Sequence, residues 1–210
     1  MIAGIVLAAG HADRMGSNKL VLPLGRGTVV GKVLATALAS CDSVFVVTGL
    51  HDQGTKTAVE QAAISLGASD RVEVVAGVPY DPGMFISVQA GLRRVGTVDA
   101  VLIFPGDIPL MSPATAMLVR DAVLRGGHTV AVPVHDGHRG HPVAFAACCI
   151  RELLAMSEHS TLRHYIEAHP AEVILVPVDD REMLLDMDTP DDYDRVVEHL
   201  ESGSAQSKEV

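Results

Sequence analysis

The stretch IVLAAGHADRMGSNKLVLPLG, residues Ile5–Gly25, decides the fold because it joins an apolar run to a glycine-rich loop. Its first four residues are all apolar, which is typical of a strand covered on both faces of a sheet. The loop that follows holds Gly10 and Gly16 together with the cations Arg14 and Lys19. Glycines allow close approach of the backbone to a ligand, and backbone N–H groups with two cations suit a phosphate. The stretch therefore predicts a buried strand whose carboxyl end meets an anion.

This loop matches neither of the common phosphate-binding signatures. Gly10 and Gly16 are too far apart for G-x-x-x-x-G-K-[ST], and Ser17 stands where that signature has its lysine. The dinucleotide fingerprint G-x-G-x-x-G is also absent from it. A surface loop whose cations are placed by chance therefore remains an alternative on these residues alone.

Outward from this stretch, short apolar runs alternate with helix-like stretches. We expect strands at Gly4–Ala9, Ser43–Thr48, Val72–Ala76, Ala100–Phe104, Thr129–Pro133, Val143–Ala146 and Val173–Val178. We expect helices at Val29–Ala39, Thr57–Leu66, Ile86–Arg94, Ala114–Arg125, Ile150–Met156, Thr161–Ala168 and Asp191–Leu200. This alternation predicts an α/β fold with a mainly parallel, helix-covered sheet, whose ligands bind beyond the carboxyl ends of the strands. The segment HDGHRG within Val130–Phe145 predicts a short antiparallel ribbon.

The composition fits one domain over residues 1–200, with residues 201–210 as a disordered tail. A net charge of −10 argues against binding to nucleic acid or to an anionic membrane surface. Cys41, Cys148 and Cys149 have neither metal-ligand nor C-x-x-C spacing, and a buried, unreactive role fits them. With no signal peptide and no apolar run near 18 residues, we expect a reducing, cytoplasmic location and no membrane partner.

Carboxylates lie next to two predicted elements. In VLIFPGDIPLM, a buried strand ends at Pro105 and delivers Asp107, which can bind Mg²⁺ or can simply form a turn or a helix cap. In LLDMDTPDDY, Asp186 and Asp188 lie on one side of an extended segment before a helix, where metal binding and helix capping are equally compatible with the pattern.

A third polar segment carries His135, His138 and His141. Their spacing within a glycine-rich loop matches no common zinc pattern, so we do not expect a structural metal there.

Five segments in a fixed order now carry a resemblance. LAAGHADRMGSNK is similar to L-A-[AG]-G-x-x-x-R-M-G-x-x-K, the signature of nucleotidyltransferases with a Rossmann-like domain of the glycosyltransferase-A type. The segments GMFISVQAGL, PGDIPLM, RGHPVAF and DMDTPDDY follow it, and the match spans nearly the whole chain. The chain therefore resembles the molybdenum cofactor cytidylyltransferases and their MobA-like relatives.

The resemblance implies a role for each matched position. It implies that Leu7, Ala8, Ala9, Gly10, Arg14 and Lys19 bind the nucleotide, and that Lys19, Arg14 and Asp107 are catalytic. It implies that Mg²⁺ is held by Asp107 and Asp188, with Asp186 as the other candidate, and that Gly83, Ser87, Arg139, Gly140 and His141 line the acceptor side.

The implied reaction transfers CMP from CTP to the terminal phosphate of a molybdopterin-type acceptor and releases pyrophosphate. A molybdoenzyme or its maturation chaperone is the implied delivery partner. His11, Asp13 and Ile86 depart from the residues frequent in the family, and Ile86 bears on the identity of the acceptor.

Other functions stay open from the sequence. Ala9 makes the motif resemble the cytidylyl branch more than the LAGG of guanylyltransferases, but GTP or a sugar or alcohol phosphate as substrate is compatible with the fold. A non-catalytic cofactor-binding relative is a further alternative. The joint presence of Arg14, Lys19, Asp107 and Asp188 argues against it.

Overall fold

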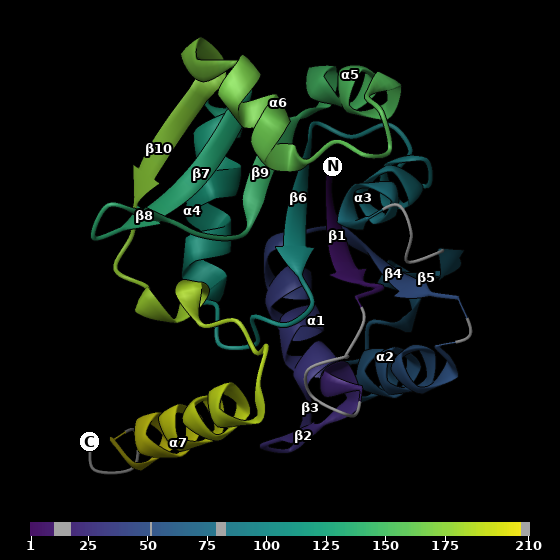
Figure 1. Ribbon diagram of the computed structural model, residues 1–210, viewed down its shortest axis with the longest axis vertical. Helices are drawn as coiled ribbons and strands as arrows, with labels where there is room; N and C mark the ends of the chain where they lie inside the picture. The colour runs from purple at the N-terminus through teal and green to yellow at the C-terminus, as the bar shows by residue number, and fades with distance from the viewer. Residues whose placement is uncertain (11–17, 51, 79–82, 207–210) are drawn as a thin grey trace.

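The structure is a computed structural model that describes residues 1–10, 18–50, 52–78 and 83–206. Within them, eight strands form one sheet in the order β10-β7-β9-β6-β1-β4-β5, with β8 paired to β7 (Figure 1). The strands are β1 (Ile2–Ala8), β4 (Ser43–Gly49), β5 (Val72–Val78), β6 (Ala100–Pro105), β7 (Val130–His135), β8 (His138–Arg139), β9 (Val143–Ala146) and β10 (Val173–Pro177). Every residue of β1 is buried, as its unbroken apolar sequence predicts.

Most of the sheet is parallel. β1 runs parallel to β4 and β6, β5 runs parallel to β4, and β10 runs parallel to β7. β9 is antiparallel to both of its neighbours, β6 and β7, and β8 returns antiparallel along the end of β7. The predicted antiparallel ribbon is thereby confirmed, and β9 extends it into the centre of the sheet.

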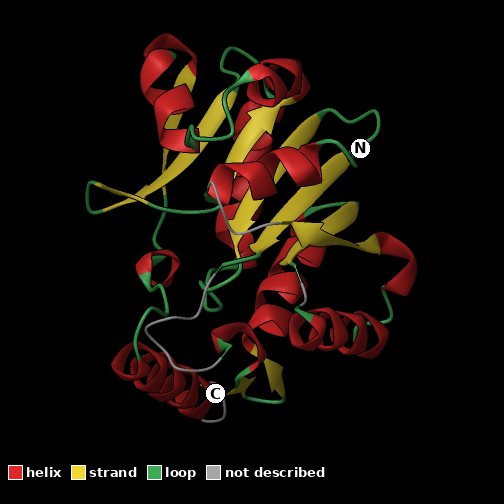
Figure 2. Cartoon of the chain, turned by 45° about the vertical axis from the view of Figure 1, so that its right-hand side comes forward, coloured by secondary structure: helices red, strands yellow, loops and turns green. Residues whose placement is uncertain are grey.

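Helices cover both faces of the sheet, as the fold prediction requires (Figure 2). The helices are α1 (Val29–Ser40), α2 (Gln53–Ser65), α3 (Met84–Leu92), α4 (Pro113–Leu124), α5 (Ile150–Ala155), α6 (Leu162–Ala168) and α7 (Pro190–Gln206). The core on one face contains buried side chains of α1, α2 and α4, and the core on the other face contains those of α3, α5 and α6. The prediction of an α/β fold with a helix-covered, mainly parallel sheet is confirmed.

The ends of the helices follow ordinary capping rules. The Thr28 hydroxyl accepts a hydrogen bond from the Gly31 N–H at the start of α1, and the Ser112 hydroxyl caps α4 just before Pro113. α7 continues past Leu200, where we expected a disordered tail to follow, so part of that tail is helical.

Two short strands had no signal in the sequence. β2 (Pro23–Leu24) and β3 (Gly27–Thr28) form a separate antiparallel pair around a turn in which Gly25 has a φ of 60°. Two residues per strand are too few to show an alternating pattern. Among the described residues, the helices are too short or too polar to cross a bilayer.

Candidate active site

The carboxyl ends of β1 and β6 lie side by side, with Leu7 opposite Pro105 in the register. The Gly106 N–H donates to the Leu7 carbonyl over 2.9 Å, and a Cβ on Gly106 would lie only 2.7 Å from that carbonyl oxygen. Real Cβ atoms essentially never lie so close to a backbone oxygen, so this turn requires glycine. The next residue, Asp107, is thereby held beside the end of β1.

Lys19 brings a cation to the same place. Its Nζ donates to Asp107 Oδ2 over 2.7 Å and to Asp188 Oδ1 over 2.8 Å, which joins three distant parts of the chain. The Lys19 side chain is only 11% exposed, and that of Asp107 is 26% exposed, so solvent screens this pair less than a surface ion pair.

The backbone of Lys19 is fixed from the side of α2. Asn18 Oδ1 accepts the Leu20 N–H at the start of the 3₁₀ turn that contains Lys19. Asn18 Nδ2 donates to Asp52 Oδ1 and to Thr55 Oγ1, each over 2.9 Å. Because Asp52 caps α2, this network ties the lysine turn to the first turn of that helix.

Asp188 is held in place through its own segment. The Met187 N–H donates to the Asp107 carbonyl over 3.2 Å, and the Met187 side chain is fully buried. Upstream, the buried Asp180 carboxylate accepts the Ser112 N–H over 2.9 Å and the Thr115 hydroxyl over 2.6 Å. The segment is therefore anchored at the N-terminus of α4 and again at Asp107.

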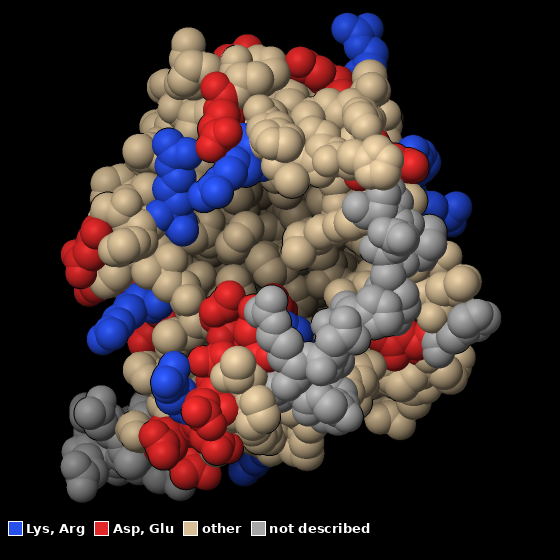
Figure 3. All heavy atoms as spheres, viewed as in Figure 1, with Lys and Arg blue, Asp and Glu red and all other residues tan. Residues whose placement is uncertain are grey.

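The electrostatics of the site reflect this concentration of charge. Burial lowers the pKa of the Lys19 ammonium, but the hydrogen bonds to Asp107 and Asp188 outweigh it and raise the pKa overall. Burial, and then the charges of Asp188 and Asp107, raise the pKa of the Asp186 carboxyl. Figure 3 shows a hollow on this face of the molecule, with Asp and Glu side chains gathered along its lower margin.

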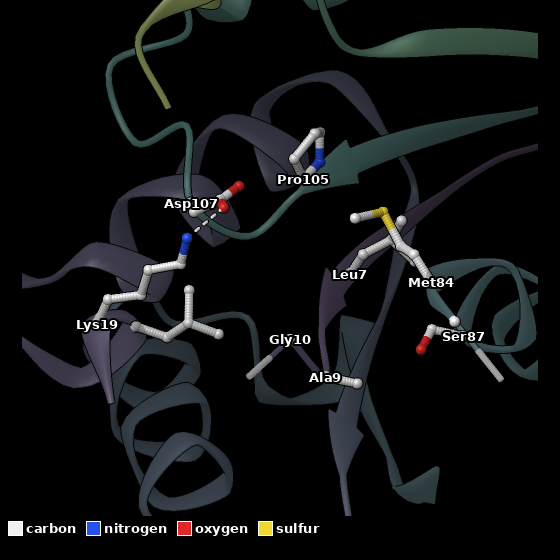
Figure 4. Close-up of a pocket in the computed structure, with 10 residues that line it drawn as sticks. Leu7, Ala9, Gly10, Lys19, Met84, Ser87, Pro105 and Asp107 are labelled. Atoms are coloured by element: carbon white, nitrogen blue, oxygen red, sulfur yellow. Dashed lines mark hydrogen bonds and ion pairs between the residues drawn. The ribbon is translucent and has the colours of Figure 1, made fainter. Parts of the chain in front are cut away.

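A pocket opens between these groups and α3 (Figure 4). Lys19 and Asp107 lie on one side of it, and Met84 and Ser87 lie on the other. Gly83 precedes α3 with a φ of 144°, a conformation that residues with a side chain rarely adopt. The lining consists of Leu7, Ala9, Gly10, Lys19, Leu20, Gly83, Met84, Ser87, Pro105 and Asp107.

Most of the predicted nucleotide-binding residues, together with Gly83 and Ser87 of the predicted acceptor side, lie in this one pocket. Ala8 differs, because its side chain is buried in the core cluster on the α1 face and leaves only its backbone for a ligand. Arg14 lies outside the described residues.

The predicted acceptor loop is divided. Arg139 lies in a separate groove with residues of α6 and β10, including Ile166 and Leu175. Burial lowers the pKa of His141, and the charge of Asp107 opposes that effect. Its Nδ1 is enclosed and has no hydrogen-bond partner among the described residues. Gly140 packs against Met183, which a Cβ at that position would meet at 2.6 Å.

Three residues of the pocket wall and one anchor were not expected from the sequence. Met84 is 69% exposed, and its position directly after Gly83 could have indicated it. Leu20 and Pro105 are neighbours of predicted site residues and could have been inferred in the same way. Nothing in the sequence around Asp180 indicates its role, because only the fold brings this carboxylate to the start of α4.

Two carboxylates and a lysine suit the binding of a metal–phosphate complex. In the part of the chain that the structure describes, no group of three or more His, Cys, Asp or Glu side chains is arranged to hold a metal ion. Mg²⁺ commonly binds one or two protein carboxylates and takes further oxygens from substrate phosphates and water. The arrangement therefore suits an ion that arrives with a phosphorylated ligand.

Comparisons with known proteins identify a matching family and several relatives. The model of the MobA-like NTP transferase domain matches residues 4–173. The molybdenum cofactor cytidylyltransferase of Escherichia coli (strain K12) is 27% identical over 189 residues, which cover 90% of this chain and 92% of that protein. The purine catabolism protein PucB of Bacillus subtilis (strain 168) is 28% identical, over 93% of this chain and 95% of that protein.

A solved structure shares the fold. The crystal structure of Rv0371c from Mycobacterium tuberculosis H37Rv in complex with manganese has a TM-score of 0.69 and 27% identity. The similarity covers 94% of this chain and 98% of that one.

Proposed function

The chain belongs to the MobA-like NTP transferase family, and on this premise we propose that it transfers CMP from CTP to the terminal phosphate of a molybdopterin-type acceptor, releasing pyrophosphate. The observation that carries the proposal is the meeting of Lys19, Asp107 and Asp188 at the carboxyl end of β1, beside a pocket that extends to Ser87. The cytidylyltransferase from Escherichia coli, similar over nine-tenths of this chain, supports this choice of substrates.

The nucleotide lies, in this proposal, along the end of β1. The Gly10 backbone and the Lys19 ammonium bind its phosphates, and Arg14 is expected to assist from the neighbouring loop. Ala9, whose side chain is almost fully buried in the pocket wall, limits the space available to the base. A pyrimidine therefore fits better than a purine.

The acceptor enters from the side of α3, near Gly83 and Ser87. A phosphate monoester has a second pKa near 6 and is mostly dianionic at neutral pH, so it attacks the α-phosphorus without a general base. No histidine is required to remove a proton. The task of the protein is to align anionic groups and to stabilise the charge of the departing pyrophosphate, which Lys19 does.

The site also fits a divalent cation. Asp107 and Asp188 present hard carboxylate oxygens close enough to share one ammonium group, and both side chains remain partly exposed. We propose that these two residues hold Mg²⁺; when bound, the ion neutralises phosphate charge and polarises the reacting phosphoryl group. The manganese complex of the mycobacterial relative supports a divalent metal in this fold.

The experiment is a screen of purified protein with the four nucleoside triphosphates, each with and without a molybdopterin acceptor, at fixed Mg²⁺. We expect pyrophosphate release only when CTP and the acceptor are both present. Release with GTP in place of CTP would contradict the choice of base. Absence of release with every pair, under conditions in which the Escherichia coli enzyme turns over, would contradict the enzymatic proposal.

A further inference from the structure

We propose that Lys19 competes with the divalent cation for Asp107 and Asp188, so that the bare protein binds the metal weakly and the triphosphate prepares the site by drawing the ammonium away. This inference deepens the proposed function and rests on it. Its core observation is that one ammonium group contacts both of the carboxylates that would hold the ion, at 2.7 and 2.8 Å.

Repulsion between the ion and the Lys19 ammonium follows from these distances. A cation bound to the two carboxylates would lie within a few ångströms of the Lys19 Nζ, and like charges so close repel by several times RT near a protein surface. The ammonium already neutralises part of the charge that would attract the ion. Metal binding at this pair therefore requires the ammonium to move, or it occurs with reduced affinity.

The side chain can move while its backbone stays in place. Lysine is a point charge on a flexible four-carbon stem. Asn18 fixes the adjacent backbone through Leu20 on one side and through Asp52 and Thr55 of α2 on the other. A rotation within the Lys19 side chain is therefore enough to exchange the carboxylates for a phosphate in the same pocket, which Lys19 itself lines.

Two opposite roles for this lysine make opposite predictions. If Lys19 competes with the ion, its removal strengthens metal binding to the bare protein. If instead it orients the carboxylates for the ion, its removal weakens binding. Loss of turnover is expected in both cases, so activity does not distinguish them and a direct binding measurement is needed.

The test is a titration of the protein with Mn²⁺ alone, without nucleotide or acceptor, in which free Mn²⁺ is followed by electron paramagnetic resonance. We expect Lys19→Met to bind Mn²⁺ about tenfold more tightly than the unaltered protein, a conservative value for two cations a few ångströms apart. Lys56→Met is the matched control, because Lys56 is 41% exposed and lies 3.9 Å from Glu60 in α2. It should leave the affinity unchanged.

Addition of Asp107→Asn to the Lys19→Met protein should remove the gain, which assigns the binding to this pair. Unchanged or weaker Mn²⁺ binding by folded Lys19→Met would overturn the inference, and Lys19→Gln repeats the test if the first variant fails to fold. Because the titration contains no nucleotide, its result is independent of whether CTP is the substrate. Failure of the proposed function would appear only in the pyrophosphate assay.

Discussion

Replacement of Gly106 by alanine tests the closeness of the two strand ends on which the site depends. The added Cβ would lie 2.7 Å from the Leu7 carbonyl oxygen and 3.4 Å from the Ala8 Cα, and both are backbone atoms that cannot rotate aside. Overpacking of this kind costs about 1–3 kcal/mol, and weakening of the Gly106 N–H bond to Leu7 adds about 1 kcal/mol. We expect a loss of about 2–4 kcal/mol in the free energy of unfolding.

For a chain of this size, such a loss lowers the melting temperature by roughly 4–16 °C. The measurement is thermal unfolding followed by circular dichroism, together with pyrophosphate release well below the melting temperature. Release should also fall, because Asp107 follows Gly106 directly and moves with it. Gly96→Ala is the control, since a Cβ there meets nothing within 4 Å. If Gly106→Ala and Gly96→Ala have the same melting temperature, the close approach of β1 and β6 is refuted.

Three further predictions concern the pocket and the thiols. Asp107→Asn should abolish metal-dependent pyrophosphate release, because an amide lacks the charge that holds a hard cation. Asp188→Asn should reduce release more mildly and Asp186→Asn least, and the largest effect at Asp186 would reverse the choice between these two carboxylates. Ala9→Gly should shift the ratio of kcat/KM for CTP over GTP toward GTP by about 10- to 200-fold, and an unchanged ratio would exclude Ala9 as its cause. Cys148 is exposed, so the buried role expected for it from the sequence is wrong. A thiol reagent at pH 8 should label Cys148 in the native protein but not Cys41, because burial raises the pKa of Cys41 to about 12. Mass spectrometry of labelled peptides checks this, and rapid labelling of Cys41 would count against it.

Much of the fold was predictable because several central strands are buried on both faces. In β1, β4 and β6 the apolar runs leave no solvent-facing position, so their existence could be inferred without knowledge of their neighbours. The position of β9 could not be inferred. The apolar sequence of its four residues fits several positions in a sheet, and only long-range pairing places β9 between β6 and β7.

The candidate site was predictable in part for a related reason. Lys19 and Asp107 follow strands that are neighbours in a parallel sheet, so their side chains were expected at one edge. The pairing with Asp188 depends instead on the anchor at Asp180 and on burial of Met187, neither of which has a local signal. Arg139 belongs to the loop predicted for the acceptor, but the pairing of β8 with β7 is consistent with its place in another groove.

The contact between Lys19 and Asp188 joins positions 169 residues apart, and this has a consequence for biosynthesis. Ribosomes add about 5–20 residues each second, so roughly 10–30 s separate the synthesis of the two partners. During that interval a nascent chain can form β1, β6 and the turn that holds Asp107, but it lacks the second carboxylate. We expect metal–nucleotide binding to appear only after the segment that contains Asp188 has left the ribosome. In the proposed function, the loading of metal and nucleotide therefore follows synthesis of the segment around Asp188, however early β1 and β6 form.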